Sequence, residues 1–427
     1  MYREILCDLE KWKDKPRRKP LILTGVRQCG KTYIVNEFAR KNFESYVYVN
    51  FEAQETLLAI FDYDFDVNRI VKELERHFKT EIVPGKTLVF FDEIQECTRA
   101  ITSLKYFCEK MRELHIVCAG SLLGVALKKK QISFPVGKVN RMQLYPMSFK
   151  EFLIANDRAD LIETFKERQV DREIPKLYTA PMEELLKAYY IVGGMPEVVK
   201  TWIDTHDYDE VEEVQNEILE DYADDFSKHA PLTDVPKIRW IWDSVPVQLA
   251  KENNKFIFSH VKEGKRSADL EDALQWLVDA GLVIKVELVE KPEIPLEGAA
   301  DKTYFKVYMS DVGLLRAKSK VSVKTILEES ALYIRYKRAF AENYVLNELK
   351  SLGKNPFFWR SGNTAEIDFI YEEDGEIVPV EVKSADNTQA KSYKQFCKKY
   401  KSKKGLKLSR KNIAQNLCES AITFLYI

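Results

Sequence analysis

Eight residues near the start of the chain have the spacing that lets a backbone loop hold phosphate groups. The pattern G-x-x-x-x-G-K-[ST] lies between a short apolar run and a helical pattern, and it consists of Gly25, Val26, Arg27, Gln28, Cys29, Gly30, Lys31 and Thr32. The glycines allow backbone N–H groups to surround phosphates at a helix N-terminus. Lys31 is expected to reach the β and γ phosphate oxygens, and Thr32 to help bind Mg²⁺. We therefore expect a site for a nucleoside triphosphate.

A later apolar run, residues 88–91, ends in two acidic residues that complete such a site. Asp92 is expected to bind Mg²⁺ through water. Glu93 would orient and deprotonate the attacking water, so the pair predicts hydrolysis as well as binding; the alternative is an acid at a helix N-terminus. Ser121 follows the next apolar run, where it either contacts the γ-phosphate or the water, or caps a helix.

A second group of polar residues lies near the C-terminus, where Asp374-Gly375 predicts a two-residue hairpin loop. Directly opposed positions then have numbers that sum to 749, which places Asp368 beside Glu381, about 5 Å apart, and Glu366 opposite Lys383. Two acids this close repel unless a cation lies between them, and their oxygens suit Mg²⁺ or Mn²⁺. A metal there would polarise a phosphodiester and activate water, with Lys383 stabilising the developing charge.

The spacing Asp-x(12)-Glu-x-Lys is similar to that of the PD-(D/E)xK nucleases. This resemblance implies a nuclease-like fold in which Asp368, Glu381 and Lys383 are site residues. It also implies a role for Glu342, in the helical run RAFAENYVLNEL, as the acid that the first helix contributes. Two other interpretations stay open. One is a solvated hairpin face on which Glu366 pairs with Lys383, and the other is a nuclease-derived fold kept only as a binding module.

The elements that must position these residues can be read from the hydrophobic pattern. Residues 20 to about 150 alternate short apolar runs with helical patterns, which predicts a parallel sheet flanked by helices. We expect strands at residues 21–23, 46–49, 88–91, 116–118 and 142–145. Ser148 and Glu151 have the spacing of a capping box, which predicts the start of a helix.

The rest of the chain is predicted to contain a helical region and a mixed α/β region. An acidic stretch at residues 209–225 is expected to face solvent. Two helical patterns followed by strand-like runs at 282–289 and 304–309 suit a winged-helix module. The predicted fold class is α/β, with a P-loop domain at 1–155, a helical and winged-helix region at 156–322 and a nuclease-like α/β domain at 323–427.

Charge points to one segment as a candidate nucleic-acid surface. The 427 residues include 66 Lys and Arg against 67 Asp and Glu, so affinity for DNA or RNA must come from a local patch. Residues 383–411 hold eleven basic residues and one acid, with Tyr393, Phe396 and Tyr400 interleaved. This pattern suits contact with a phosphate backbone. A solvated basic helix face is the alternative.

Composition excludes several other classes of protein. The sequence is 45% hydrophobic, which is typical of a globular protein. It has no apolar run of the length that a membrane helix needs, and the first residues do not resemble a secretory signal. The seven cysteines include no Cys-x-x-Cys pair, which argues against a disulfide framework and a zinc site. We expect a cytoplasmic protein without a membrane partner.

Several motifs together resemble AAA-type P-loop ATPases of bacteria and archaea, of the STAND and archaeal-ATPase kind, that carry a C-terminal domain of unknown function. The resemblance extends over nearly the whole chain through GVRQCGKT, VYVNFE, LVFFDEIQE, CAGS, LYPMSFKEF, IVGGMPEVV, DAGLV, YMSDVGLL, AENYVLNEL, EIDFI and PVEVKS. It implies ATP and Mg²⁺ binding, slow hydrolysis and a fold in three parts. Relatives commonly have Gly-Arg where this chain has Gly137-Lys138, so Lys138 and Arg141 are both candidates for the charge-stabilising side chain.

These observations lead to one functional hypothesis and two alternatives. The hypothesis is an ATPase whose nucleotide state reorganises the middle region and controls a C-terminal metal-dependent nuclease-like or nucleic-acid-binding module. The first alternative is a nucleotide-dependent switch or scaffold whose C-terminal domain binds a partner without catalysis. The second is that only the ATPase is functional. The expected partners are ATP, DNA or RNA, and further copies of the same chain.

Overall fold

The protein divides into two compact units. The structure, a computed structural model, describes residues 1–120, 123–125, 134–166, 174–251, 254–362, 365–383, 391–409, 414–416 and 419–423. The first unit consists of Met1–Leu144 with Asp279–Gly281, and the second of Tyr145–Val278 with Leu282–Ile427. In the described part of the chain, no helix is both long enough and apolar enough to cross a membrane.

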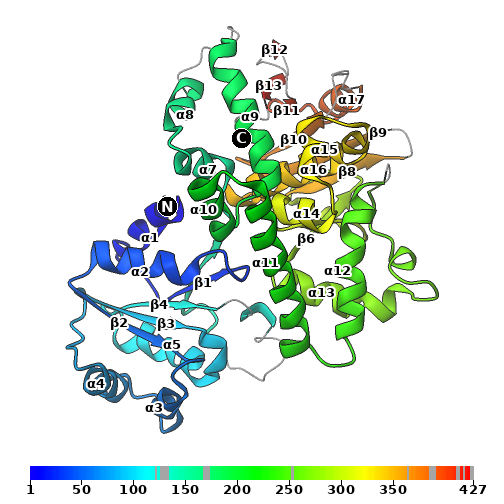
Figure 1. Cartoon of the computed structure of the whole chain (residues 1–427). Helices are drawn as coiled ribbons and strands as arrows, with labels where there is room; N and C mark the ends of the chain where they lie inside the picture. The colour runs from blue at the N-terminus through cyan, green and yellow to red at the C-terminus, as the bar shows by residue number, and fades with distance from the viewer. Residues whose placement is uncertain are drawn as a thin grey trace. The chain divides into compact units, whose positions relative to one another are not determined.

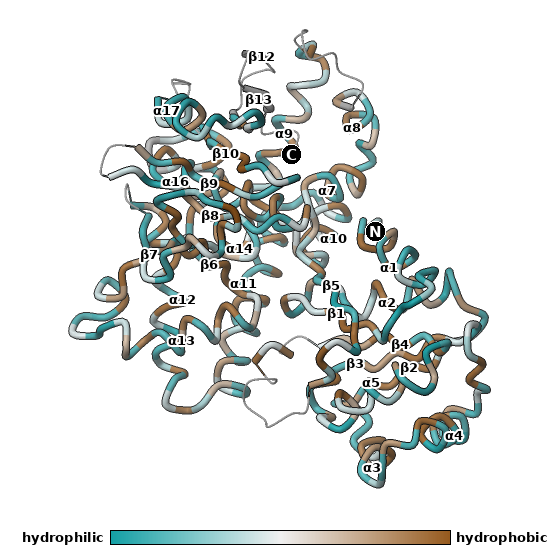
Figure 2. The backbone as a smooth tube through the Cα atoms, turned by 180° about the vertical axis from the view of Figure 1, so that it is seen from behind, coloured by the Kyte–Doolittle hydropathy of each residue, from teal (hydrophilic) through white to brown (hydrophobic). Residues whose placement is uncertain are grey.

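The first unit is built on a five-stranded parallel sheet with the strand order β2-β3-β4-β1-β5 (Figure 1). Its strands are β1 (Leu21–Gly25), β2 (Ser45–Asn50), β3 (Thr87–Asp92), β4 (His115–Ala119) and β5 (Asn140–Leu144). All six residues of β3 are buried, as expected for a strand covered on both faces, and Figure 2 shows this strand as largely hydrophobic. The prediction of an α/β fold with a parallel sheet is confirmed.

Helices flank this sheet. They are α1 (Ile5–Lys13), α2 (Lys31–Asn42), α3 (Ala59–Asp62), α4 (Val67–Phe78) and α5 (Thr98–Lys110). In Figure 1, α2 lies on one side of the sheet and α5 on the other. A core on one face joins Val47, Val89 and Ile116 of the strands to Ile101 and Leu104 of α5. Burial on both faces fixes the strand ends, and with them the loops that follow the strands.

The second unit begins with helices. They are α7 (Phe149–Ala155), α8 (Ala159–Lys166), α9 (Lys176–Val192), α10 (Pro196–Thr205), α11 (Tyr208–His229), α12 (Val235–Leu249), α13 (Ser267–Asp279), α14 (Val312–Lys318), α15 (Val323–Leu327), α16 (Ala331–Ser351) and α17 (Lys391–Tyr400). The side chains of Ser148 and Glu151 form both bonds of a capping box at the start of α7, which confirms that prediction. Seven of the nine acidic residues in the stretch 209–225 of α11 are exposed, as expected, whereas Glu212 is half-buried and Asp225 is buried.

The second unit also contains an eight-stranded mixed sheet with the order β12-β13-β11-β10-β9-β8-β6-β7. Its strands are β6 (Val283–Val289), β7 (Asp301–Met309), β8 (Phe357–Ser361), β9 (Ala365–Glu373), β10 (Glu376–Lys383), β11 (Leu406–Ser409), β12 (Ala414–Asn416) and β13 (Glu419–Thr423). The β6–β7 hairpin follows two helices, as predicted, and β6 also pairs with β8. The strands on either side of the predicted 322/323 boundary therefore belong to one sheet.

The hairpin of β9 and β10 has the predicted loop and register. Asp374 (φ 51°) and Gly375 (φ 76°) both take positive φ values, which is the requirement of a type I′ turn. The observed pairs run from Glu376 with Glu373 to Val380 with Phe369. Every pair sums to 749, so the register expected from the sequence is confirmed.

Candidate functional site

The phosphate-binding motif forms the turn between β1, which ends at Gly25, and α2, which begins at Lys31. Gln28 (φ 63°) and Gly30 (φ 91°) take the left-handed conformation. Turns of this kind direct successive backbone N–H groups into one concave site for an anion. A Cβ atom on Gly25 would lie 2.4 Å from the carbonyl oxygen of Leu144, so this position requires glycine. The backbone thus has the form that phosphate binding needs.

The Lys31 side chain folds back into this loop. Its ammonium group donates hydrogen bonds to the carbonyl oxygens of Gly25 (3.0 Å) and Val26 (2.9 Å). The residue is only 7% exposed, although it carries a charge. An ammonium group has three donors, of which these carbonyls use two. The positive charge is therefore held on the same turn as the backbone N–H groups expected to surround a phosphate.

Thr32 and Asp92, the two residues expected to hold Mg²⁺, lie side by side. The Thr32 hydroxyl donates to Oδ2 of Asp92 at 2.7 Å, and the Tyr48 hydroxyl donates to the same oxygen at 3.0 Å. The other carboxylate oxygen accepts the backbone N–H of Glu93 at 3.1 Å. Asp92 is 2% exposed, and these bonds fix its side chain at the end of β3.

Glu93 begins the turn after β3 in a left-handed conformation, with φ 47° and ψ 46°. Such a backbone is uncommon for a residue with a side chain, and it often marks a functional site. The side-chain amide of Gln95 donates to the Glu93 carboxylate. Gln95 packs against Gly120, where a Cβ atom would lie 2.2 Å from its side-chain oxygen. Glu93 is thus held next to Asp92 by backbone and side-chain contacts.

The residues present fit a magnesium–nucleotide complex. A hydroxyl and a carboxylate 2.7 Å apart are oxygen ligands of the kind that Mg²⁺ prefers. A lysine and a turn rich in backbone donors complement the phosphate charge. Thr32 and Asp92 would hold the ion, Lys31 the phosphates and Glu93 the water.

The structure does not bring every predicted residue to this site. Ser121 lies outside the described residues. Arg141 pairs in register with Ile22 of β1, three residues before Gly25, which corresponds to about 10 Å along a strand. Its guanidinium lies 4.5 Å from the ring centre of Phe134. Lys138 instead forms an ion pair of 2.8 Å with Glu109.

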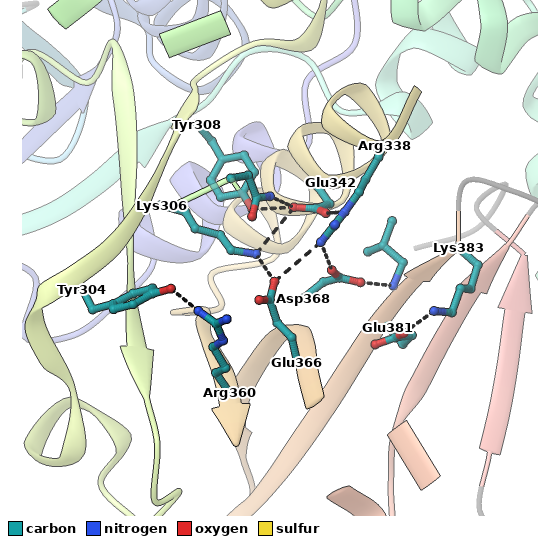
Figure 3. Close-up of polar contacts among 12 residues, drawn as sticks. Tyr304, Lys306, Tyr308, Arg338, Glu342, Arg360, Glu366, Asp368, Glu381 and Lys383 are labelled. Atoms are coloured by element: carbon teal, nitrogen blue, oxygen red, sulfur yellow. Dashed lines mark hydrogen bonds and ion pairs between the residues drawn. The ribbon is translucent and has the colours of Figure 1, made fainter. Parts of the chain in front are cut away.

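The C-terminal candidates lie together in the second unit, where α16 packs against β10 and its Arg338 reaches Asp368 of β9 (Figure 3). Glu342 is completely buried. Its carboxylate accepts hydrogen bonds from the Asn254 amide (2.6 Å) and the Tyr308 hydroxyl (2.7 Å), and it also pairs with Arg338. The ammonium group of Lys306 lies 3.9 Å away. Glu342 is therefore the most fully satisfied acid of the group.

Asp368 and Glu381 lie on the neighbouring strands β9 and β10, as the register predicts. Asp368 accepts the backbone N–H of Val382 at 2.8 Å and lies 3.4 Å from Arg338. Glu381 pairs with Lys383 through one oxygen. Its second oxygen, Oε2, is buried and has no hydrogen-bond partner among the described residues. The chain thus places two acids and the predicted lysine on one face of the hairpin.

Glu366 does not form an ion pair with Lys383, so the salt bridge expected under the alternative of a solvated hairpin face is wrong. Its carboxylate pairs instead with Lys306 of β7 at 2.7 Å and lies 3.5 Å from Arg338. Lys383 turns to Glu381 on its own strand. The reason is that β7 and α16 bring other cations to this face. We call Glu342, Glu366, Asp368 and Glu381 the acid cluster.

The pKa values within the acid cluster diverge. Burial raises the pKa of Asp368 well above its ordinary value, and the charges of Glu342 and Glu381 add to the effect. Burial also raises the pKa of Glu381. Burial opposes ionisation of Glu342 too, but Arg338 and Lys306 bring its pKa to about 2. A cation between Asp368 and Glu381 would favour their ionised forms.

The basic segment is less open than its sequence indicates. Tyr393 and Phe396 are fully buried, and Phe396 packs on Trp359, so the expectation that they accompany the lysines on the surface is wrong. Lys403 pairs with Glu376 at 2.9 Å, and Lys404 with Asp374 at 3.3 Å. The exposed lysines of α17 are Lys391, Lys394, Lys398 and Lys399. Arg410 and Lys411 lie outside the described residues.

Four residues that contact the candidate sites were not predicted from the sequence: Tyr48, Gln95, Lys306 and Arg338. Arg338 precedes Glu342 by four residues in a helical pattern, a spacing that predicts an ion pair. Tyr48 lies in the strand next to β3, but nothing in its spacing predicts that it would contact Asp92. Gln95 and Lys306 carry no signal that we can identify.

Comparison with known families supports the reading of the first unit. Residues 17–153 match a family described as an AAA domain. Residues 183–325 and 337–426 match two families described as domains of unknown function, DUF8612 and DUF4143. The first unit is therefore a P-loop domain of the AAA type. A search of curated proteins found no match.

Solved structures similar to this chain include archaeal proteins. A Walker-type ATPase of Pyrococcus abyssi is 14% identical, with a TM-score of 0.47 over 74% of this chain and 95% of that protein. The ORC2 protein of Aeropyrum pernix is 12% identical, with a TM-score of 0.38 over 77% of this chain and 95% of that protein. A STAND protein of Pyrococcus horikoshii is 14% identical, with a TM-score of 0.28 over 81% of this chain and 47% of that protein.

Proposed function

We propose that the first unit binds ATP with Mg²⁺ and hydrolyses it. The observation that supports this function most is the contact of 2.7 Å between Thr32 and Asp92, next to a turn that holds Lys31. It joins two motifs that are 60 residues apart in the sequence. A glycine turn without a nucleotide function would not need a buried carboxylate opposite its hydroxyl.

Each residue has a separate role in this proposal. The backbone N–H groups of residues 25–32 and the Lys31 ammonium bind the β and γ phosphates. Thr32 and Asp92 hold Mg²⁺, which neutralises phosphate charge when bound. Glu93 accepts a proton from the attacking water, and Gln95 keeps the Glu93 carboxylate in place. Water attack breaks the bond between the γ-phosphorus and the bridging oxygen, which leaves with ADP.

Nucleotide binding is the first test of this proposal. A fluorescent ATP analogue with Mg²⁺ should bind the wild-type chain, and Lys31→Ala should weaken binding by about tenfold or more because a charged contact with phosphate is lost. Lys72→Ala, an exposed lysine on α4, serves as the control and should bind normally. Absence of binding to the wild-type chain would contradict the proposal.

A second candidate function belongs to the C-terminal module. We infer that Asp368 and Glu381 hold Mg²⁺ or Mn²⁺ for cleavage of a phosphodiester in DNA or RNA, with Lys383 and Glu342 in supporting roles. The unpaired Oε2 atom of Glu381, buried next to Asp368, favours this inference. The exposed lysines of α17 offer a contact for a polyanion.

Cleavage assays separate this function from a switch or scaffold. Metal-dependent cleavage of DNA or RNA that is lost in Asp368→Ala and kept in Lys31→Ala would support the nuclease. Binding of nucleic acid or protein without cleavage would support the switch. In either case we propose that the nucleotide state controls the C-terminal module.

One candidate for a catalytic arginine, Arg141, would act from a second copy of the chain. Arg141 lies about 10 Å back along the sheet from its own phosphate loop. We therefore propose that Arg141, if it stabilises the transferred phosphate, does so in a neighbouring copy of a homo-oligomer. Mixing Arg141→Ala with Lys31→Ala would then restore turnover that each variant lacks alone.

A further inference from the structure

We propose that Arg338 is an internal counter-ion of the acid cluster, and that a divalent cation binds Asp368 and Glu381 only after the Arg338 guanidinium moves away. This inference rests on the proposed C-terminal metal site and concerns how that site is controlled. It starts from the position of one side chain in Figure 3.

Arg338 contacts three of the four acids. It pairs with Glu342 one helical turn later, and one guanidinium nitrogen lies 3.4 Å from Asp368 and 3.5 Å from Glu366. A guanidinium that bridges these carboxylates neutralises negative charge that a cation bound at Asp368 would otherwise neutralise. Among the described residues, no group of three or more acidic, histidine or cysteine side chains is arranged to hold a metal.

The charges of the cluster nearly balance when Arg338 is in place. With every carboxylate ionised, four negative charges face three positive ones, those of Lys306, Arg338 and Lys383. One negative charge is therefore in excess. In the same cluster, the buried Oε2 of Glu381 has no hydrogen-bond partner among the described residues. Without Arg338 the excess is two, which is the charge that one divalent cation supplies. A metal can therefore replace Arg338 and leave the cluster neutral.

Arg338 is also the cation that can leave. Its side chain is 44% exposed, whereas that of Lys306 is 1% exposed. When Arg338 moves, Oε2 of Glu342 keeps the bonds from Asn254 and Tyr308, while Oε1 loses its contact with Arg338 and is left to the incoming cation.

The acids left by this movement are those expected to hold the metal. Asp368 keeps the bond from Val382 through Oδ2, while its Oδ1 loses the contact with Arg338. That oxygen and Oε2 of Glu381 then become available to a cation. The apparent association constant for the metal is therefore the intrinsic constant multiplied by the fraction of molecules in which Arg338 has already moved away.

Titration with Mn²⁺ tests this inference in the full-length chain. The relevant signal is the Mn²⁺ binding that Asp368→Asn removes, so that any binding in the first unit is excluded. Arg338→Met keeps the aliphatic stem but removes the charge, and it should bind Mn²⁺ at this site about tenfold or more tightly than the wild type. Arg360→Met is the matched control and should leave the Mn²⁺ affinity unchanged. Arg360 lies on β8, opposite Glu366 of β9, but its side chain pairs with Tyr304.

Each outcome of this titration has one meaning. If the wild-type chain binds Mn²⁺ at the Asp368 site and Arg338→Met binds no more tightly, the counter-ion role is overturned and the metal site remains. If neither protein shows binding that depends on Asp368, both the metal site and the counter-ion role are overturned. If Arg338→Met does not fold, Arg338→Lys replaces it, because a lysine reaches fewer carboxylates at once. An Arg338→Lys affinity equal to that of the wild type would then overturn the inference.

Discussion

At the scale of single residues, Asp311 is a buried acid that joins two parts of the second unit. Its carboxylate accepts the backbone N–H of Gly194 at 2.6 Å and that of Leu314, at the start of α14, at 2.8 Å. Glycine is required at position 193, because a Cβ atom there would lie 2.2 Å from Oδ1 of Asp311. Burial raises the pKa of Asp311 to about 6, against the effect of these hydrogen bonds.

This pKa predicts a pH dependence of stability. Because the folded pKa of about 6 exceeds the ordinary value of 3.8, the folded state binds more protons between these values, so stability falls as pH rises through this window. The free energy of unfolding should be about 1 kcal/mol larger at pH 5 than at pH 7 from this group alone. In Asp311→Asn the pH 5 to pH 7 difference, measured by urea unfolding, should shrink by that amount. An unchanged difference would contradict the assignment.

Residues in continuous motifs could be predicted from the sequence, whereas their supporting contacts could not. Lys31 and Thr32 follow from a fixed spacing, and Asp92 from its place at the end of a buried strand. Tyr48 reaches Asp92 only because β2 and β3 pair with Asn50 opposite Asp92. That register depends on packing, which the pattern of one strand does not contain.

At the scale of elements, the hairpin of β9 and β10 positions Asp368 against Glu381. Its register was predictable because the Asp374-Gly375 loop leaves one way to count opposed residues. Which cations would face these acids was not predictable. Lys306 comes from β7, and its contact with Glu366 spans 60 residues of sequence.

The turn glycine should stabilise this hairpin. Gly375 has φ 76° and no heavy atom within 4 Å of an added Cβ atom, so Gly375→Ala adds backbone strain without a steric clash. We expect a loss of about 1 kcal/mol in the free energy of unfolding of the second unit. Urea titration followed by tryptophan fluorescence measures this loss.

Gly298→Ala is the matched control for this substitution. Its φ is not in the left-handed region, and the nearest atom to an added Cβ is 3.9 Å away. It should leave stability unchanged or slightly raised. Equal effects of the two substitutions would show that the turn conformation does not matter.

At the scale of the whole molecule, the two units divide the chain differently from the three predicted segments. The parallel pairing of β6 with β8 joins Leu288 to Phe358, which are 70 residues apart. Strands that are so far apart in the sequence show no common pattern in local periodicity. The strands could therefore be predicted one by one, but not their pairing in a single sheet. The predicted boundaries at 155 and 322 stay predictions.

The proposed control by nucleotide predicts changes far from the phosphate loop in sequence. In Glu93→Gln with ATP, compared with ADP, amide hydrogen exchange should differ in α11–α13 and in β9–β10, because the nucleotide state is expected to reorganise the middle region. Lys31→Ala should show no such difference. Changes limited to residues 1–144 would contradict the control and leave ATP hydrolysis untouched.

ATP turnover of Glu93→Gln is the most direct test of the central claim, that residues 25–32 together with Asp92 and Glu93 form a hydrolytic site. The amide keeps the size of the side chain but cannot accept the proton of the attacking water. We predict that Glu93→Gln binds a fluorescent ATP analogue as tightly as the wild type. Its rate of ATP hydrolysis should be lower than that of the wild type by a factor of about 100 or more. Turnover equal to that of the wild type, with binding intact, would contradict the claim.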